Sequence, residues 1–155
     1  MGTGQQSEAE SPCPIESGAV GQSAYSAAKA GIAALTLVQA AELGRYGVTV
    51  NAIAPAARTR MTETVFSEMM KAPESGFDAM HPANIAPLVV WLGSTESSEV
   101  TGRVFEVRGG EICVYQGWRP GPTVDKGARW DPSELGPVVR RLLSEAVAPM
   151  KPYGA

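Results

Sequence analysis

The fold is decided by residues 21–55, which read GQSAYSAAKAGIAALTLVQAAELGRYGVTVNAIAP. Residues 23–46 are rich in alanine and apolar on most sides, with a thin polar stripe at helical spacing. They therefore predict a helix that is buried on most sides. Residues 48–54 are short, apolar and partly β-branched, which predicts a buried parallel strand that ends at Pro55. The stretch therefore predicts a long helix that leads directly into a strand of a parallel sheet.

The rest of the chain continues the alternation of helix and strand. Two further helices are expected. The first covers residues 62–71, because Glu63 stands in the first turn after a suitable cap. The second covers residues 83–93, where apolar side chains recur at helical spacing. The apolar face of the second of these helices should consist of Ile85, Leu88, Val89 and Leu92. Another buried strand is expected over residues 104–107, closed by Gly109 and Gly110. This order of elements predicts the α/β fold class.

Capping residues mark where these helices should begin and end. Ser23 and Thr62 are the expected N-caps of the first two helices, and Gly47 is the expected terminator of the first. Residues 131–134 read Asp-Pro-Ser-Glu, a cap followed by proline at the first helical position and glutamate at the third. This signature predicts a short helix that runs to about Val147.

Composition along the chain predicts three regions. Residues 1–20 are rich in Gln, Ser, Glu, Pro and Gly and show no period, so we expect a disordered or irregular leader. Residues 21–110 carry the α/β pattern. Residues 111–155 are expected to form an irregular extension with the short helix, in which Trp118 and Trp130 pack rather than bind a ligand.

Overall composition excludes several classes of function. The chain has 155 residues, a net charge of −3, 44% hydrophobic and 19% charged residues, which fits one soluble domain. The weak negative charge argues against nucleic acid as a partner. No apolar run is long enough for a membrane helix, and the polar, acidic N-terminus is no secretory signal, so we expect a cytoplasmic protein with no membrane partner. We expect no metal site, because His81 is the lone histidine and Cys13 and Cys113 stand far apart.

Tyr25 and Lys29 are four residues apart in the first helix, so their side chains should lie on one face. A fixed ammonium group stabilises a nearby phenolate, and such a tyrosine can exchange a proton with a carbonyl or alcohol oxygen. The pattern Tyr-x-x-x-Lys is weak when taken alone, because on a solvated face such a pair usually has no catalytic role. Its place at the start of an apolar helix followed by a buried strand favours the chemical interpretation.

Residues 21–55, together with residues 102–110 (GRVFEVRGG), resemble the short-chain dehydrogenase/reductase family. The stretch carries that family's Tyr-x-x-x-Lys helix, its Asn-x-Ile-x-Pro strand end and its last strand. The segments ARTRMTETV (57–65) and GARWDPSELGPVV (127–139) look most like 3-oxoacyl-thioester reductases and 3-hydroxyacyl-CoA dehydrogenases. The resemblance covers residues 21–110 and implies a doubly wound Rossmann fold with NAD or NADP as the hydride carrier.

The same resemblance implies roles for individual residues. Tyr25 would be the catalytic acid/base, and Lys29 would stabilise its phenolate and hold the ribose hydroxyls of the nicotinamide nucleotide. The loop after Pro55 would lie against the nicotinamide through its backbone and hydroxyl groups. The candidate cofactor-binding residues are Tyr25, Lys29, Pro55, Ala56, Ala57 and Thr59.

Two departures from the family pattern point to a partial domain. The sequence has no glycine-rich dinucleotide fingerprint, and Pro12 stands where the family's catalytic serine would be. We therefore expect the C-terminal half of the Rossmann fold, without its N-terminal strands and glycine-rich loop.

Two hypotheses for the function follow. The first is an NAD(P)-dependent oxidoreductase that interconverts a hydroxyl and a ketone on an acyl thioester. The second is a truncated, non-catalytic fragment or oligomerisation module. Two strands leave unpaired edges and uncovered apolar surface, so a homo-oligomer or a complex with a full-length relative is expected.

Overall fold

The structure of the protein is a computed structural model that describes residues 20–68 and 70–149. The described residues up to Tyr115 belong to one compact unit, and those from Gln116 onward belong to a second, so each unit is described by itself. Except for Val20, the leader expected over residues 1–20 lies outside the described residues, as does Pro12.

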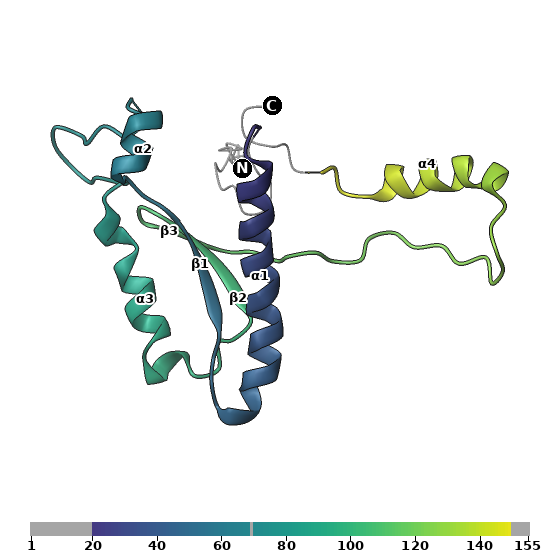
Figure 1. Cartoon of the computed structure of the whole chain (residues 1–155), viewed down its shortest axis with the longest axis horizontal. Coiled ribbons are helices and arrows are strands. Elements are labelled where there is room, and N and C mark those ends of the chain that lie inside the picture. The colour runs from purple at the N-terminus through teal and green to yellow at the C-terminus, as the bar shows by residue number, and fades with distance from the viewer. Residues whose placement is uncertain (1–19, 69, 150–155) are drawn as a thin grey trace, which may run out of the picture. The chain divides into compact units, whose positions relative to one another are not determined.

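The first helix, α1, spans Ser23–Leu43 and confirms the strongest prediction from the sequence (Figure 1). Its N-cap is Gln22, which makes no side-chain capping bond, so the assignment of Ser23 as the cap was wrong by one residue. After a short 3₁₀ turn the helix is terminated at Gly47, whose φ of 73° lies in the left-handed region that favours glycine. The predicted terminator is therefore confirmed.

Two parallel strands follow, as the sequence predicts: β1 (Asn51–Ala56) and β2 (Arg103–Arg108). Their register pairs Asn51 with Arg103 and Ala56 with Arg108. Pro55 lies inside β1 and does not end it. Proline is tolerated there because β1 is an edge strand, and an edge strand leaves one row of N–H groups unpaired.

A third strand, β3 (Glu111–Val114), pairs antiparallel with β2 and gives the sheet order β1-β2-β3. Residues 111–114 were expected to belong to the irregular extension, and that prediction is wrong. Gly109 and Gly110 form a two-residue connection between two β-prone runs, which is a recognised hairpin signal. Gly109 has a φ of 57°, so the turn uses its conformational freedom.

Two short helices lie between β1 and β2. The first, α2, spans Arg60–Val65, and the second, α3, spans Ala86–Leu92. In α3, Leu88 is buried and Leu92 is partly buried as predicted, and so is Ile85 directly before the helix, but Val89 is 49% exposed.

The core lies between α3 and one face of the sheet. Leu88 packs with Phe105 and Val107 of β2, and Val107 is only 1% exposed. Further hydrophobic side chains border this cluster: Ile53, Ile85, Leu92 and Val100. Helix α1 contacts β1 and β2, and Figure 1 shows the sheet between α1 and α3, as a doubly wound fold requires.

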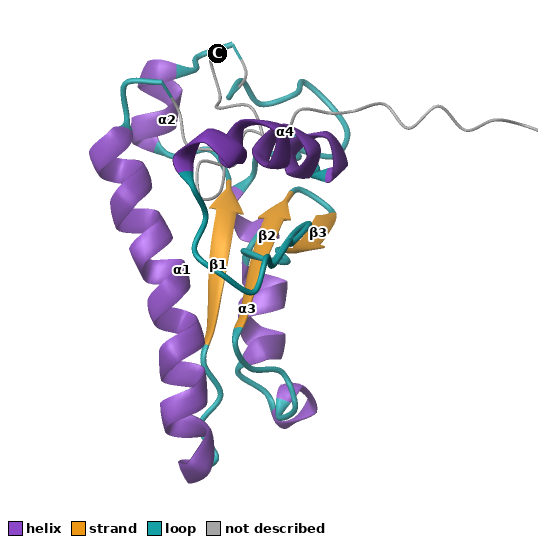
Figure 2. Ribbon diagram, turned by 90° about the vertical axis from the view of Figure 1, so that its right-hand side faces the viewer, coloured by secondary structure: helices purple, strands orange, loops and turns teal. Residues whose placement is uncertain are grey.

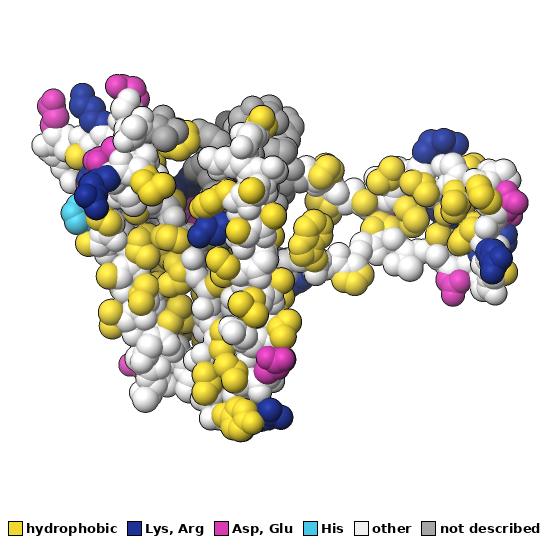
Figure 3. Space-filling view, in the orientation of Figure 1, with side chains coloured by type: hydrophobic (Ala, Val, Ile, Leu, Met, Phe, Trp, Pro, Cys, Tyr) yellow, Lys and Arg dark blue, Asp and Glu magenta, His cyan; other side chains and the backbone are white. Residues whose placement is uncertain are grey.

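Most of α1 is exposed in the isolated chain, although its composition predicts burial on most sides. Only Thr36 and Ala40 are buried. Large apolar side chains along the helix are about half exposed, and Figure 3 shows hydrophobic atoms along its visible face. They are Ile32, Leu35, Leu37 and Val38. A three-stranded sheet covers one side of a 21-residue helix and leaves the other side to solvent.

The second unit contains helix α4 (Leu135–Glu145), which ends two residues before the predicted Val147. The predicted capping box is present, because Asp131 accepts from the Ser133 N–H at 2.8 Å and Glu134 accepts from the Asp131 N–H at 3.0 Å. It caps a 3₁₀ turn, Pro132–Glu134, so α4 itself begins three residues later than predicted. Trp118 is fully exposed, so the expectation that it packs was wrong.

Candidate functional site

Tyr25 and Lys29 lie side by side in the first turns of α1. The Lys29 Nζ is 5.3 Å from the centroid of the Tyr25 ring, so both side chains share one face of the helix, as the four-residue spacing predicts. Tyr25 is 47% exposed, and Lys29 is half-buried. The phenol is therefore accessible to a small molecule while an ammonium group stands next to its ring.

The remaining predicted site residues follow one another at the carboxyl end of β1. Pro55 and Ala56 are the last residues of the strand, and Ala57 and Thr59 lie in the connection to α2. The connection from α1 to β1 is short, so the two elements run in opposite directions, and the start of α1 lies at the carboxyl end of β1 (Figure 2). The structure thus brings all six predicted residues to one end of the sheet, the end at which α/β folds bind ligands.

Thr59 has a structural role that the sequence analysis assigned to Thr62. The Thr59 hydroxyl accepts from the Thr62 N–H at 3.2 Å, and the Thr62 hydroxyl accepts from the Thr59 N–H at 2.7 Å. This reciprocal pair is the capping box of α2. Thr59 is therefore the N-cap, Thr62 is the third helical residue, and the Thr59 hydroxyl is fixed in direction.

Arg58 was missed by the sequence analysis, yet it makes a dense set of contacts at this end of the sheet. Its guanidinium forms a two-pronged ion pair with the Asp78 carboxylate, and its Nη1 also donates to the Met70 carbonyl at 3.0 Å. Its backbone N–H donates to the Met80 carbonyl at 2.7 Å. No local spacing rule connects residues 58 and 78, so the contact had no signal in the sequence.

The ion pair changes the titration of both partners. Hydrogen bonds from Arg58 hold the pKa of the Asp78 carboxyl below its ordinary value, and the bond to Asp78 raises the pKa of the Arg58 guanidinium. Both side chains are largely shielded from solvent, at 15% and 21% exposed. The pair is therefore charged at neutral pH.

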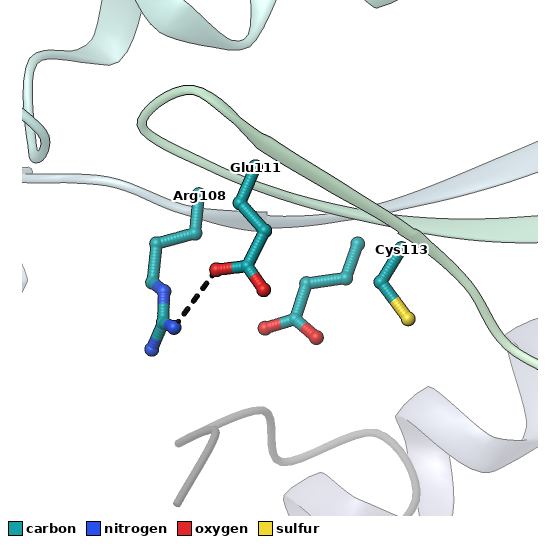
Figure 4. A pocket seen from close by; sticks show the side chains of 4 residues that line it. Arg108, Glu111 and Cys113 are labelled. Atoms are coloured by element: carbon teal, nitrogen blue, oxygen red, sulfur yellow. Dashed lines mark hydrogen bonds and ion pairs between the residues drawn. The ribbon is translucent and has the colours of Figure 1, made fainter. Parts of the chain in front are cut away.

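A small pocket lies at the β2–β3 hairpin, lined by Glu106, Arg108, Glu111 and Cys113 (Figure 4). Arg108 pairs with Glu111 at 3.0 Å, and the Tyr115 hydroxyl donates to Glu106 at 2.8 Å. The cavity volume is about 10 Å³, which has room for about one water molecule. It is too small for a substrate.

In residues 20–68 and 70–149, no group of three or more His, Cys, Asp or Glu side chains is arranged to hold a metal ion. The His81 ring instead accepts from the Ala83 N–H at 3.1 Å in the turn before α3. None of the helices in the described part combines the length and apolarity needed to cross a bilayer.

Comparison with known proteins places these features in a family. A family model described as enoyl-(acyl carrier protein) reductase matches residues 14–111. The chain is 41% identical to hydroxyacyl-CoA dehydrogenase ChsB1 from Mycobacterium tuberculosis over 79% of this chain and 39% of that protein. It is 44% identical to the peroxisomal hydratase-dehydrogenase-epimerase of Saccharomyces cerevisiae over 66% of this chain and 11% of that protein.

A crystal structure of a short chain dehydrogenase from Mycobacterium avium is also similar, with a TM-score of 0.77 and 63% identity. The alignment covers 92% of this chain and 46% of that one, so the chain spans less than half of each relative named here. The fold is accordingly part of the α/β Rossmann fold of these proteins. On the matched residues and the shared fold, the chain belongs to the short-chain dehydrogenase/reductase family.

Proposed function

We propose that the chain carries the acid/base pair of an NAD(P)-dependent oxidoreductase that interconverts a hydroxyl and a ketone on an acyl thioester. The observation that carries this proposal is the contact between Tyr25 and Lys29 at the carboxyl end of β1, with the phenol exposed. The similarity to a hydroxyacyl-CoA dehydrogenase supports the choice of an acyl-thioester substrate.

In this proposal Tyr25 moves the proton of the reaction. Its hydroxyl donates to the carbonyl oxygen during reduction and accepts from the alcohol during oxidation. The Lys29 ammonium, 5.3 Å from the centroid of the ring, lies beside the group that exchanges this proton. A bound nicotinamide would supply or accept the hydride at the substrate carbon.

The chemistry of the described residues fits the nicotinamide riboside end of such a cofactor. The Lys29 ammonium has three donors for ribose hydroxyls. Backbone groups are also present at the carboxyl end of β1, in Ala56, the last residue of the strand, and in Ala57, directly after it. The Thr59 hydroxyl is held in place by the capping box. Within the described residues no glycine-rich turn leads from a strand into a helix, as a diphosphate site requires, because the Gly109–Gly110 turn leads into β3; these residues would therefore hold that one end.

The apolar side of α1 favours a second candidate function, an oligomerisation module without activity of its own. Four large apolar side chains of this helix are about half exposed, and an apolar surface of that kind is typical of protein–protein contacts. The occupant would be a second copy of the chain or a full-length relative. Sedimentation of the chain alone, and then mixed with a full-length relative, would detect either complex.

The decisive experiment follows turnover and cofactor binding in one set of variants. The wild type is titrated with NADH and NADPH by fluorescence and assayed for reduction of acetoacetyl-CoA. Tyr25→Phe removes the proton donor, so turnover should fall by about 10²–10⁴-fold. A wild type that binds neither nucleotide and reduces no acetoacetyl-CoA would contradict the enzyme proposal and favour the module.

The other end of α1 provides a matched control. Arg45 lies 4.7 Å from the centroid of the Tyr46 ring, so this pair resembles Tyr25 and Lys29 but lies away from the carboxyl end of β1. Tyr46→Phe should leave turnover unchanged. Equal losses in Tyr46→Phe and Tyr25→Phe would show that the effect is structural rather than chemical.

A further inference from the structure

Residues 78–80, just before the turn at Pro82, lie across the carboxyl ends of both parallel strands. The Met80 carbonyl accepts a hydrogen bond from the backbone N–H of Arg58, which lies two residues beyond the end of β1. Ala79 lies beside Gly109, one residue beyond the end of β2, where an added Cβ would be 3.1 Å from the Ala79 Cβ. Residues 78–80 therefore span the carboxyl end of the sheet, where the candidate site lies.

Asp78 is the point at which this segment is fixed from several directions. Its carboxylate binds Arg58 and also accepts from the Met80 N–H at 3.1 Å. Its carbonyl accepts from the Asn84 side chain at 2.9 Å, and Asn84 also donates to Ala79 at 3.2 Å. The loop is thus held by one ion pair to Arg58, two residues beyond β1, and by the Asn84 amide to the turn before α3.

The pair between Arg58 and Asp78 differs from an ordinary surface pair in its geometry and shielding. The planar guanidinium reaches the two carboxylate oxygens with two nitrogens and still reaches the Met70 carbonyl. Both side chains are mostly covered, whereas in the pair between Arg108 and Glu111 the carboxylate side chain is 66% exposed. A two-pronged pair fixes orientation as well as distance.

We propose that Arg58 and Asp78 are positioning residues that hold residues 70–80 as one wall of the acyl-thioester site, directly beside Thr59. This inference rests on the proposed function, because the wall has a role only if an acyl thioester binds at this end of the sheet. The pair touches neither the reacting atoms nor the cofactor. Its loss should therefore weaken substrate binding and leave the proton transfer at Tyr25 unchanged.

The test separates KM from kcat in two mild variants. Arg58→Lys keeps the charge but loses the two-pronged geometry, and Asp78→Asn keeps the shape but loses the charge. Each should raise the KM for acetoacetyl-CoA by about tenfold, the scale of one or two lost charge-assisted bonds, with kcat within about twofold and its pH profile unchanged. A double variant with Arg58→Asp and Asp78→Arg should recover part of the lost affinity.

Glu111→Gln is the matched control, because it makes the same carboxylate-to-amide change in the hairpin pair, and it should leave KM unchanged. Poor folding lowers the active fraction and so lowers kcat without raising KM. A normal KM in both mild variants, or a fall in kcat alone, would overturn the positioning role while leaving the enzyme proposal intact.

Direct binding of acetoacetyl-CoA by calorimetry distinguishes the remaining outcomes. A wild type that binds the thioester without turning it over contradicts the proposed function. In that case about tenfold weaker binding in Asp78→Asn supports the positioning role, and unchanged binding overturns it. A wild type that neither binds nor turns over the thioester overturns both proposals.

Discussion

Helix α1 and strand β2 show opposite relations between sequence and burial. The helix has 21 residues, most of them apolar, but buries only Thr36 and Ala40. The strand has six residues, two of them arginines, but buries all four positions from Val104 to Val107. The apolar composition of a segment determines how much of its surface could be buried, and its neighbours determine how much is buried.

The neighbours explain the difference. Strand β2 is central in the sheet, so its backbone pairs on both edges, and helices lie over both of its faces. Helix α1 meets the sheet along one side, and large apolar side chains elsewhere along it are about half exposed. Its exposed leucine and valine side chains are surplus to the fold of this unit and available to a partner.

The largest expected effect on stability comes from the buried strand. Val107→Ala removes two methyl groups from a site that is 1% exposed, so it should lower the free energy of unfolding by about 2 kcal/mol. Urea unfolding followed by circular dichroism measures the change. Val38→Ala, in the half-exposed part of α1, is the matched control and should change it by less than about 0.5 kcal/mol in a monomer.

The same two variants also test whether the apolar face of α1 is exposed in solution. If Val38→Ala costs as much as Val107→Ala, and the cost falls with dilution, the α1 face is covered by another chain. Equal costs that do not depend on concentration would contradict the arrangement of α1 described here.

The second effect lies in the turn between β2 and β3. Gly109→Ala places a side chain at a φ of 57°, where an added Cβ is 3.1 Å from Ala79, so it should destabilise the protein by about 1–2 kcal/mol. Gly110→Ala adds its Cβ into open space and is the control. A larger loss in Gly110→Ala, measured by the same unfolding assay, would show that the turn is built differently.

Local rules predicted the elements whose signals lie within a few residues. The apolar run of α1, the capping sequence before α4 and the spacing of Tyr25 and Lys29 all act within one or two helical turns. The parallel pairing of β1 and β2 was also predicted, because short buried strands separated by helices pair in that way. The strand β3 had a local signal in the two glycines before it, Gly109 and Gly110, which the prediction from the sequence did not use.

Contacts between distant residues were beyond the sequence. Arg58 and Asp78 are 20 residues apart, and the segment between them has no regular pattern that fixes its path. Choosing Thr62 over Thr59 as the cap was a smaller error of the same kind, because both threonines suit the position and only the backbone decides. The candidate site was therefore predictable on α1 and β1, and not in the loop that covers their end.

The third effect concerns the cap of α2. Thr59→Ala removes the hydroxyl that accepts from the Thr62 N–H, so it should lower the free energy of unfolding by about 1 kcal/mol. Thr64→Ala removes an exposed hydroxyl that donates within the same helix, to the Arg60 carbonyl, and should have little effect. Thermal unfolding of the two variants compares them, and equal losses would contradict the capping role.

The smallest effect is expected in acid. Near neutral pH the Asp78 carboxylate is fully charged, so a change of pH there does not alter its contribution to stability. The pKa of Asp78 is lower in the folded chain than in the unfolded chain, so the unfolded chain takes up its proton first as pH falls. The stabilisation is complete above the ordinary aspartate pKa of about 3.9 and is lost below it, as pH falls through the folded pKa. The free energy of unfolding, measured from pH 7 down to acid, should therefore fall less steeply below about pH 4 in Asp78→Asn than in the wild type. Identical slopes in the two proteins would show that Arg58 does not hold this carboxylate in solution, and the wall that residues 70–80 form at the sheet edge would lose its fixed point.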